Sequence, residues 1–232
     1  MNESLLKNNV HDKLSILGKP GDEVVEEICN ANWLELSKDD LIDVAWIYYF
    51  FSVQFRENLE IACRLFPDDE QLQELDKGER NTDNLSPYPG VVATSERVNH
   101  DEFMRRTLDL TPIEHTRRCR LEDIGAAYLC RVRAIDDGAR ATSLASYEDG
   151  GLEKVFTSIL KATRWNDPLL RAFKHFLEKH IEFDSDVENG HGGLCRHLPP
   201  DEQVSELWGA FKESLVRGVP ALKSNSPLTL NK

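Results

Sequence analysis

One stretch of the chain, Val44–Phe51, is apolar on nearly every side of a helix. Ser37 followed by Asp40 is a variant of the capping box that begins helices, and Pro67 ends a helix, so the sequence predicts one long helix over about Lys38–Phe66. A helix that is hydrophobic all round has to be covered by other helices. The chain is therefore predicted to be an all-α protein, with this helix in the middle of a bundle.

Apolar residues recur at helical spacing along most of the remaining chain, and no segment alternates with the period of a strand. Because no linker or internal repeat interrupts this pattern, we expect a single helical domain over residues 1–222. Residues 1–20 are expected to form a partly irregular arm, and residues 223–232 a disordered tail. The further predicted helices cover Leu5–Leu17, Asp22–Asn30, Asp68–Lys77, a segment starting near His100, Ile124–Ile135, Ala141–Ala162, a segment starting at Pro168 and Asp201–Val216.

Charge and composition exclude some classes of partner. The 232 residues include 41 acidic and 28 basic side chains, and the net charge of -13 argues against nucleic acid and against an anionic membrane. The longest apolar run, Val44–Val53, is too short to span a bilayer. The five cysteines form no Cys-x-x-Cys pair and Met1–Gly18 lacks the apolar core of a secretory signal, so we expect a cytoplasmic protein with reduced thiols.

Two helices carry polar side chains on their predicted inner face. An apolar stripe that begins at Leu169 and includes Leu177 reaches His180 one turn later and Asp184 after one more turn. Glu148 falls within the apolar stripe of Ala141–Ala162. A buried carboxylate is unfavourable unless it is paired or binds a metal ion. These positions therefore indicate a buried polar site.

Together with His100, these residues form a candidate constellation of two histidines and two carboxylates. Helical carboxylates and histidines from several segments can build a dinuclear iron or manganese site. Taken singly, a histidine on an apolar face is more often a hydrogen-bonded core residue, and a single Glu is more often on the surface. The combination is what favours a metal site.

Three sequence motifs and one separation between residues carry a resemblance to a known family. Asn99–Phe103 resembles its Asn-His-x-Glu-Leu/Phe segment, Glu74–Gly78 resembles its Asp-Glu-Leu-Gly-x-Gly segment, and His180–Asp184 resembles its His-x-x-x-Asp motif. Glu148 precedes His180 by about the separation that the family has for its central ligand. Over most of residues 36–222 the chain is similar to the haem-oxygenase-like diiron oxidases and oxygenases, whose fold includes the CADD-like and TenA-like branches.

The resemblance implies a haem-oxygenase-like helical bundle and a set of six metal ligands. The last histidine of the family usually follows the Asp by three positions, where this chain has Val187, so His191 takes that role and Glu188 is the alternative. For the first ligand, the motif favours Glu74, whereas the apolar stripe of the same helix favours Glu79. The implied ligands are Glu74, His100, Glu148, His180, Asp184 and His191.

The resemblance also implies a function. It predicts an oxidoreductase with two iron ions, or manganese in their place, that activates dioxygen on a small organic substrate, with Glu148 as the bridging carboxylate at the catalytic centre. A homodimer is expected of this fold. Two alternatives stay open at this point: a metal-free enzyme similar to the TenA and PqqC branches, and a non-catalytic interaction protein with a degraded metal site.

Aromatic residues of the long helix are expected either to line a substrate pocket or to pack in the core; they are Tyr48, Tyr49, Phe51 and Phe55.

Overall fold

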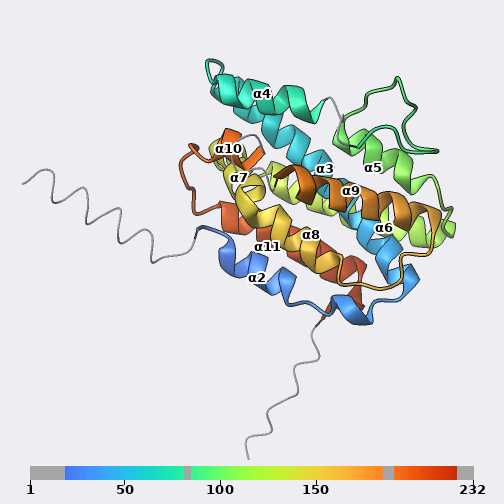
Figure 1. The fold of residues 1–232 in the computed structure, drawn as a ribbon. Coiled ribbons are helices and arrows are strands. Elements are labelled where there is room, and N and C mark those ends of the chain that lie inside the picture. Colours follow the sequence, from blue (N-terminus) through green and yellow to red (C-terminus); the bar gives the residue numbers. More distant parts are fainter. Residues whose placement is uncertain (1–18, 81–84, 185–190, 224–232) are drawn as a thin grey trace, which may run out of the picture.

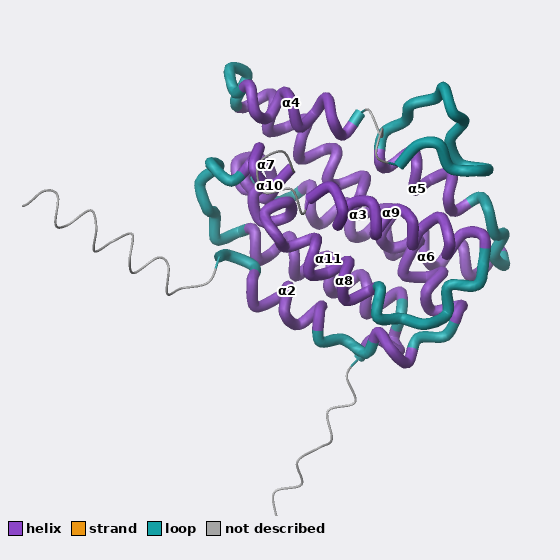
Figure 2. The backbone as a smooth tube through the Cα atoms, viewed as in Figure 1, coloured by secondary structure: helices purple, strands orange, loops and turns teal. Residues whose placement is uncertain are grey.

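The computed structural model describes residues 19–80, 85–184 and 191–223, and leaves out the side chain of Asp184. In this part of the chain every regular element is helical and no strand is formed, which confirms the predicted all-α class. Figures 1 and 2 show the helices gathered into one bundle. The elements are α2 (Asp22–Cys29), η1 (Trp33–Glu35), α3 (Lys38–Leu65), α4 (Glu70–Glu79), α5 (His100–Leu108), α6 (His115–Arg133), α7 (Asp137–Ser146), η2 (Tyr147–Gly151), α8 (Leu152–Ile159), α9 (Pro168–Asp184), α10 (His191–Cys195), α11 (Val204–Gly218) and η3 (Pro220–Leu222).

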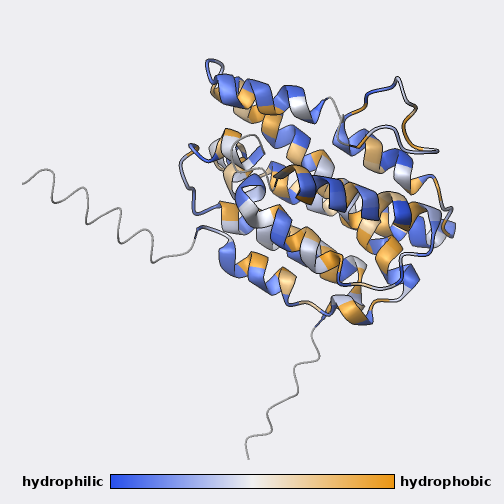
Figure 3. Cartoon of the chain, viewed as in Figure 1, coloured by the Kyte–Doolittle hydropathy of each residue, from blue (hydrophilic) through white to orange (hydrophobic). Residues whose placement is uncertain are grey.

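The long helix α3 forms the centre of the bundle, as predicted. The Ser37 hydroxyl accepts a hydrogen bond from the backbone N–H of Asp40, and the Asp40 carboxylate accepts one from the backbone N–H of Ser37. Every residue from Leu41 to Tyr48 is buried, because α4, α5, α6, α7, α9 and α11 all pack against α3. Figure 3 shows that apolar (orange) and polar (blue) residues alternate along the helices. None of the helices in the described ranges is long and apolar enough to cross a membrane.

The predicted helix over Ala141–Ala162 is not continuous, and this part of the prediction was wrong. Helix α7 ends at Ser146, a π turn (η2) covers Tyr147–Gly151, and α8 follows. Gly150 has a φ of 96°, a left-handed conformation that glycine adopts without strain. The break changes the direction of the chain immediately after Glu148, one of the predicted ligands.

The long loop before α5 packs against the rest of the protein over its described part, since its residues Leu85, Val91 and Val92 are buried. Arg106 donates a hydrogen bond of 3.1 Å to the carbonyl of Val91, which holds the loop on α5. The predicted helix over residues 5–17 and all but the first residue of the predicted tail lie outside the described residues. The single-domain boundaries, the homodimer and the cytoplasmic location stay predictions.

Candidate functional site

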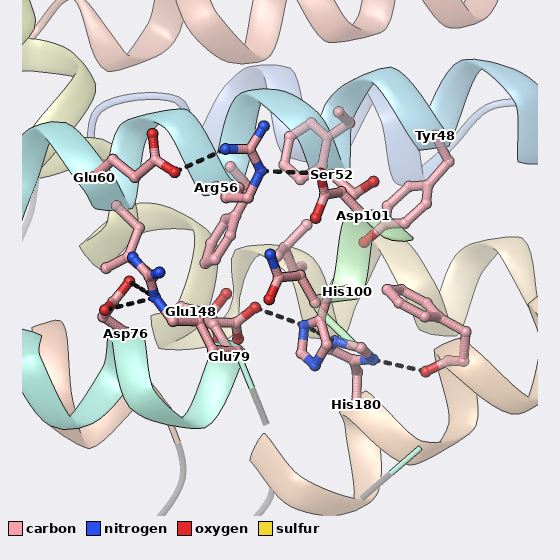
Figure 4. A pocket seen from close by; sticks show the side chains of 17 residues that line it. Tyr48, Ser52, Arg56, Glu60, Asp76, Glu79, His100, Asp101, Glu148 and His180 are labelled. Carbon is pink, nitrogen blue, oxygen red and sulfur yellow. Dashed lines mark hydrogen bonds and ion pairs between the residues drawn. The ribbon is translucent and has the colours of Figure 1, made fainter. Parts of the chain in front are cut away.

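Five ionisable side chains are buried together where five helical segments meet. Glu79 ends α4, His100 begins α5, Glu148 lies in the π turn, His180 lies on α9, and His191 begins α10. Each residue is at most 8% exposed. Figure 4 shows the labelled members of this group pointing toward one another. We call these five residues the central cluster.

The contacts of the central cluster form one continuous chain. His180 Nε2 lies 3.1 Å from His100 Nδ1, which in turn lies 2.6 Å from Glu79 Oε2. The second oxygen of the same carboxylate, Oε1 of Glu79, is 3.3 Å from His191 Nδ1. His191 Nδ1 is also 3.3 Å from Glu148 Oε2. One carboxylate therefore lies between two imidazoles, and a second carboxylate lies beyond them.

The orientation of the His180 ring is fixed by its own helix. Asp167 caps α9 by accepting a hydrogen bond from the backbone N–H of Leu169, and the stripe that follows buries Phe176 and then His180. His180 Nδ1 donates a 2.7 Å hydrogen bond to the carbonyl of Phe176. That bond places the proton on Nδ1 and directs the lone pair of Nε2 into the cluster.

A close approach between two backbones brings His191 and Glu148 together. Helix α10 packs against the π turn, and a Cβ atom added at Gly192 would lie 2.9 Å from the carbonyl oxygen of Glu148. Only glycine permits that distance. The π turn is held from outside as well, since the Asp149 carboxylate pairs with Lys19 at 2.5 Å and with Arg196 at 2.8 Å.

Burial and mutual charge perturb the titration of the cluster. Burial raises the pKa of the Glu79 carboxyl, but the charge and hydrogen bond of His100, followed by the charges of His191 and His180, outweigh burial and hold that pKa well below its ordinary value. Burial and the charge of His100 lower the pKa of His180 to about 3. At neutral pH Glu79 is therefore ionised and His180 is neutral, the forms in which both bind metal ions.

A cavity of about 40 Å³ adjoins the central cluster. Four cluster residues line it, namely Glu79, His100, Glu148 and His180. Its remaining wall is apolar toward the inside of the bundle and charged toward the surface. The apolar wall consists of Tyr48, Phe51, Phe55, Leu59, Leu152 and Phe176. Three of the four aromatic residues predicted for a pocket thus line the cavity, whereas Tyr49 does not and is half-buried.

The structure brings together four of the six predicted ligands: His100, Glu148, His180 and His191. It does not bring Glu74 there, because that side chain is 60% exposed and pairs with Lys77 on the outer face of α4. Glu79, left open as the alternative, occupies the place expected of Glu74; it follows the buried Leu72 and Leu75 on the inner face of the helix.

The sixth predicted ligand, Asp184, has its side chain outside the described residues. Residues 185–190, which include Val187 and the alternative ligand Glu188, lie outside them as well. Sequence reasoning also missed Gly192 and the charged residues around the cavity, and no sequence signal distinguishes these from ordinary surface or helix positions.

The central cluster offers carboxylates and imidazoles, which are the groups that bind iron or manganese in helical proteins. Over the described ranges, no three His, Cys, Asp or Glu side chains form a group that could hold a metal ion as they stand. The nitrogen and oxygen atoms of the central cluster instead contact one another directly, at 2.6–3.3 Å. Two ligand atoms bound at right angles to one metal ion, with bonds of about 2.1 Å, would be separated by a similar distance, roughly 3 Å. His100 Nε2 is buried without a hydrogen-bond partner among the described residues, so this nitrogen is also available to bind a metal ion.

Comparison with known proteins identifies no relative: no family model matches the chain, and no curated protein or solved structure matches it.

Proposed function

We propose that the protein is a non-haem iron oxidase or oxygenase, with two irons held in a haem-oxygenase-like bundle, that activates dioxygen on a small organic substrate. One observation carries the proposal: two carboxylates and three imidazoles from five separate helical segments meet in the interior of the bundle, beside a cavity. A buried group of this kind is unfavourable unless something compensates for it. A pair of cations is the compensation that best suits this donor set.

Glu79, His100, Glu148, His180 and His191 would hold the metal, and Asp184 is the predicted sixth ligand. Bound iron would supply the redox chemistry with dioxygen. The protein's own residues would orient the ligands, offset the metal charge and exclude water. His180 keeps its Nε2 lone pair available because its other nitrogen is bonded to the carbonyl of Phe176. The two carboxylates offset the metal charge, and the apolar wall of the cavity excludes bulk water.

A metal-free acid–base enzyme is the second candidate, and one specific contact favours it. His100 Nδ1 lies within hydrogen-bond distance of two acceptors, Glu79 Oε2 at 2.6 Å and His180 Nε2 at 3.1 Å. A carboxylate that orients an imidazole is an arrangement used in general acid–base catalysis. These contacts need no metal ion.

An anaerobic titration with iron(II) separates the two candidates. The full chain, freed of metal, is titrated with iron(II), and bound iron is measured after gel filtration. The proposal expects about two irons per chain, as in other helical carboxylate sites. Glu148→Ala should lose at least one of them, whereas Glu74→Gln should lose none, because Glu74 is exposed and pairs with Lys77 at the surface.

Dioxygen consumption is then measured for the iron-loaded protein. Rapid uptake that disappears in Glu148→Ala supports the oxidase or oxygenase proposal. Failure of the unmodified chain to bind iron in the titration contradicts it and favours the metal-free acid–base enzyme.

A further inference from the structure

Another cavity, of about 200 Å³, borders the π turn that carries Glu148, and we call it the second cavity. It lies between the segment before α2, the end of α7, the π turn and the connection from α10 to α11. Asp149 lines the second cavity, whereas Glu148, the residue before it, lines the smaller cavity beside the central cluster. The π turn therefore contributes to the walls of both cavities.

Two cations and one carboxylate form the charged end of the second cavity. Arg196 Nε and Nη2 lie 3.1 and 2.8 Å from Asp149 Oδ1, and Lys19 Nζ lies 2.5 Å from Asp149 Oδ2. Arg196 Nη1 makes no hydrogen bond to another described residue, and both cations are more than half exposed. Because one carboxylate offsets only one of the two charges, this end of the cavity has cationic N–H groups available.

The other acidic residue of the lining, Asp201, is engaged elsewhere. Its Oδ1 accepts a 2.8 Å hydrogen bond from the backbone N–H of Gln203, beside the start of α11. A carboxylate at the beginning of a helix is stabilised by the free N–H groups and by the helix dipole. Among the described contacts Asp201 forms no ion pair with Lys19 or Arg196.

The remaining wall of the second cavity is mostly apolar. Leu198 and Val204 belong to the buried core, and they continue the wall inward from the charged end. Small-molecule sites are characteristically hollows with an apolar wall and a few convergent polar groups. The second cavity has both features. Its apolar lining consists of Pro20, Ala145, Leu198, Pro200 and Val204.

We propose that the second cavity binds a small carboxylic acid with an apolar body, and that the carboxylate of this ligand binds Arg196 and Lys19. The apolar body would lie along Ala145, Leu198 and Val204. A volume of about 200 Å³ has room for on the order of ten water molecules, so an acid with about nine non-hydrogen atoms fits. An amine of the same shape is disfavoured, because its ammonium group would meet the two cations.

The position of Asp149 gives such a ligand an effect on the central cluster. The ion pair between Asp149 and Arg196 connects the π turn to the segment that follows α10, the helix that begins with His191. A ligand carboxylate that shares Arg196 weakens this connection, so Glu148 is held less firmly against His191. The acid should therefore weaken metal binding, and the metal should weaken acid binding by the same factor. This regulatory role rests on the proposed function, whereas the binding of the acid does not.

The first test uses cyclohexanecarboxylate, with cyclohexylmethanol and cyclohexylmethylamine as a neutral and a cationic ligand of the same size. Binding of each to the full metal-free chain is measured by isothermal titration calorimetry. We expect the acid to bind at least ten-fold more tightly than the alcohol or the amine. Equal binding of acid and alcohol would overturn the inference.

Variants locate the carboxylate of the ligand. Arg196→Gln and Lys19→Gln should each weaken acid binding at least five-fold. Arg131→Gln is the matched control and should change acid binding less than two-fold, because Arg131 is 51% exposed, close to the 54% of Arg196, but pairs with Glu213 away from the second cavity. Equal weakening by the control would mean a general charge effect and would overturn the inference.

A further variant covers the case in which Arg196→Gln fails to fold. Asp149→Asn removes the carboxylate that competes for Lys19 and Arg196, so acid binding should tighten several-fold. Unchanged or weaker binding in Asp149→Asn would contradict the proposal.

The regulatory role is tested by repeating the anaerobic iron(II) titration with saturating cyclohexanecarboxylate. Iron binding to the unmodified chain should weaken at least three-fold, and the acid should have no such effect in Arg196→Gln. Unchanged iron affinity would overturn the regulatory role and leave the acid site standing. A chain that binds the acid but no iron under any condition contradicts the proposed function, and the regulatory role fails with it.

Discussion

Replacing Gly192 by alanine tests whether the close contact between α10 and the π turn holds the site together. The new Cβ would lie 2.9 Å from the Glu148 carbonyl oxygen and 3.3 Å from the Cα atom of Asp149. Both neighbours are backbone atoms, which cannot rotate away as the end of a flexible side chain can. Either α10, with His191 at its start, or the π turn, with Glu148, therefore has to move.

The expected loss of stability follows from two opposing effects. Overpacking of this kind costs about 1–3 kcal/mol, and rigid backbone neighbours put Gly192→Ala near the upper end. Alanine in place of a helical glycine stabilises the helix by about 1 kcal/mol, which offsets part of this loss. The net loss is roughly 2 kcal/mol, which lowers the melting temperature of a chain of this length by about 4–8 °C. Gly209→Ala is the matched control, because a Cβ at Gly209 has no atom within 4 Å and only the helix-propensity gain remains.

The assay is thermal unfolding of the metal-free proteins, followed by circular dichroism, with urea unfolding as a second measure. Gly192→Ala should melt below the unmodified chain, and Gly209→Ala at or a few degrees above it. If both substitutions raise the melting temperature equally, α10 does not press on the π turn, and the account of how His191 meets Glu148 is refuted.

Two further predictions concern stability away from the site. Ser37→Ala removes the hydroxyl that accepts the backbone N–H of Asp40 and should cost about 1 kcal/mol in urea unfolding; no measurable change would mean that this cap does not stabilise α3. Burial raises the pKa of Glu57, but its bond to Arg133 and the charges of Arg133 and Arg140 outweigh burial and leave that pKa below its ordinary 4.5. Because the folded pKa is depressed, this stabilisation is present above about pH 4.5 and disappears as the pH falls through the folded pKa. Glu57→Gln should therefore be less stable than the unmodified chain at pH 7, and this difference in stability should shrink as the pH falls below 4.5. A difference that stays constant from pH 7 down to pH 3 would contradict the assignment.

The sequence predicted the elements whose signals are local and strong. Helix α3 was predicted from its capping box, its proline stop and an apolar surface on all sides, and each of these works within the helix itself. His180 was placed in the core because it continues the apolar stripe of α9 by one turn. In both cases the signal lies within a single helix and can be read without knowing what packs against that helix.

The parts that sequence reasoning missed depend on contacts between distant segments. Glu74 and Glu79 lie on one helix, and only the packing of α4 against α3 and α10 determines which of them points inward. The break after Glu148 depends on Gly150, which a helical pattern tolerates but which here adopts a positive φ.

The most direct test of the central claim is anomalous X-ray diffraction at the iron edge. Crystals of the full chain are grown with iron(II) in the absence of dioxygen. The account predicts anomalous peaks within bonding distance of Glu79, His100, Glu148, His180 and His191. Iron-saturated crystals in which these five side chains still touch one another directly, with no anomalous peak between them, would contradict it.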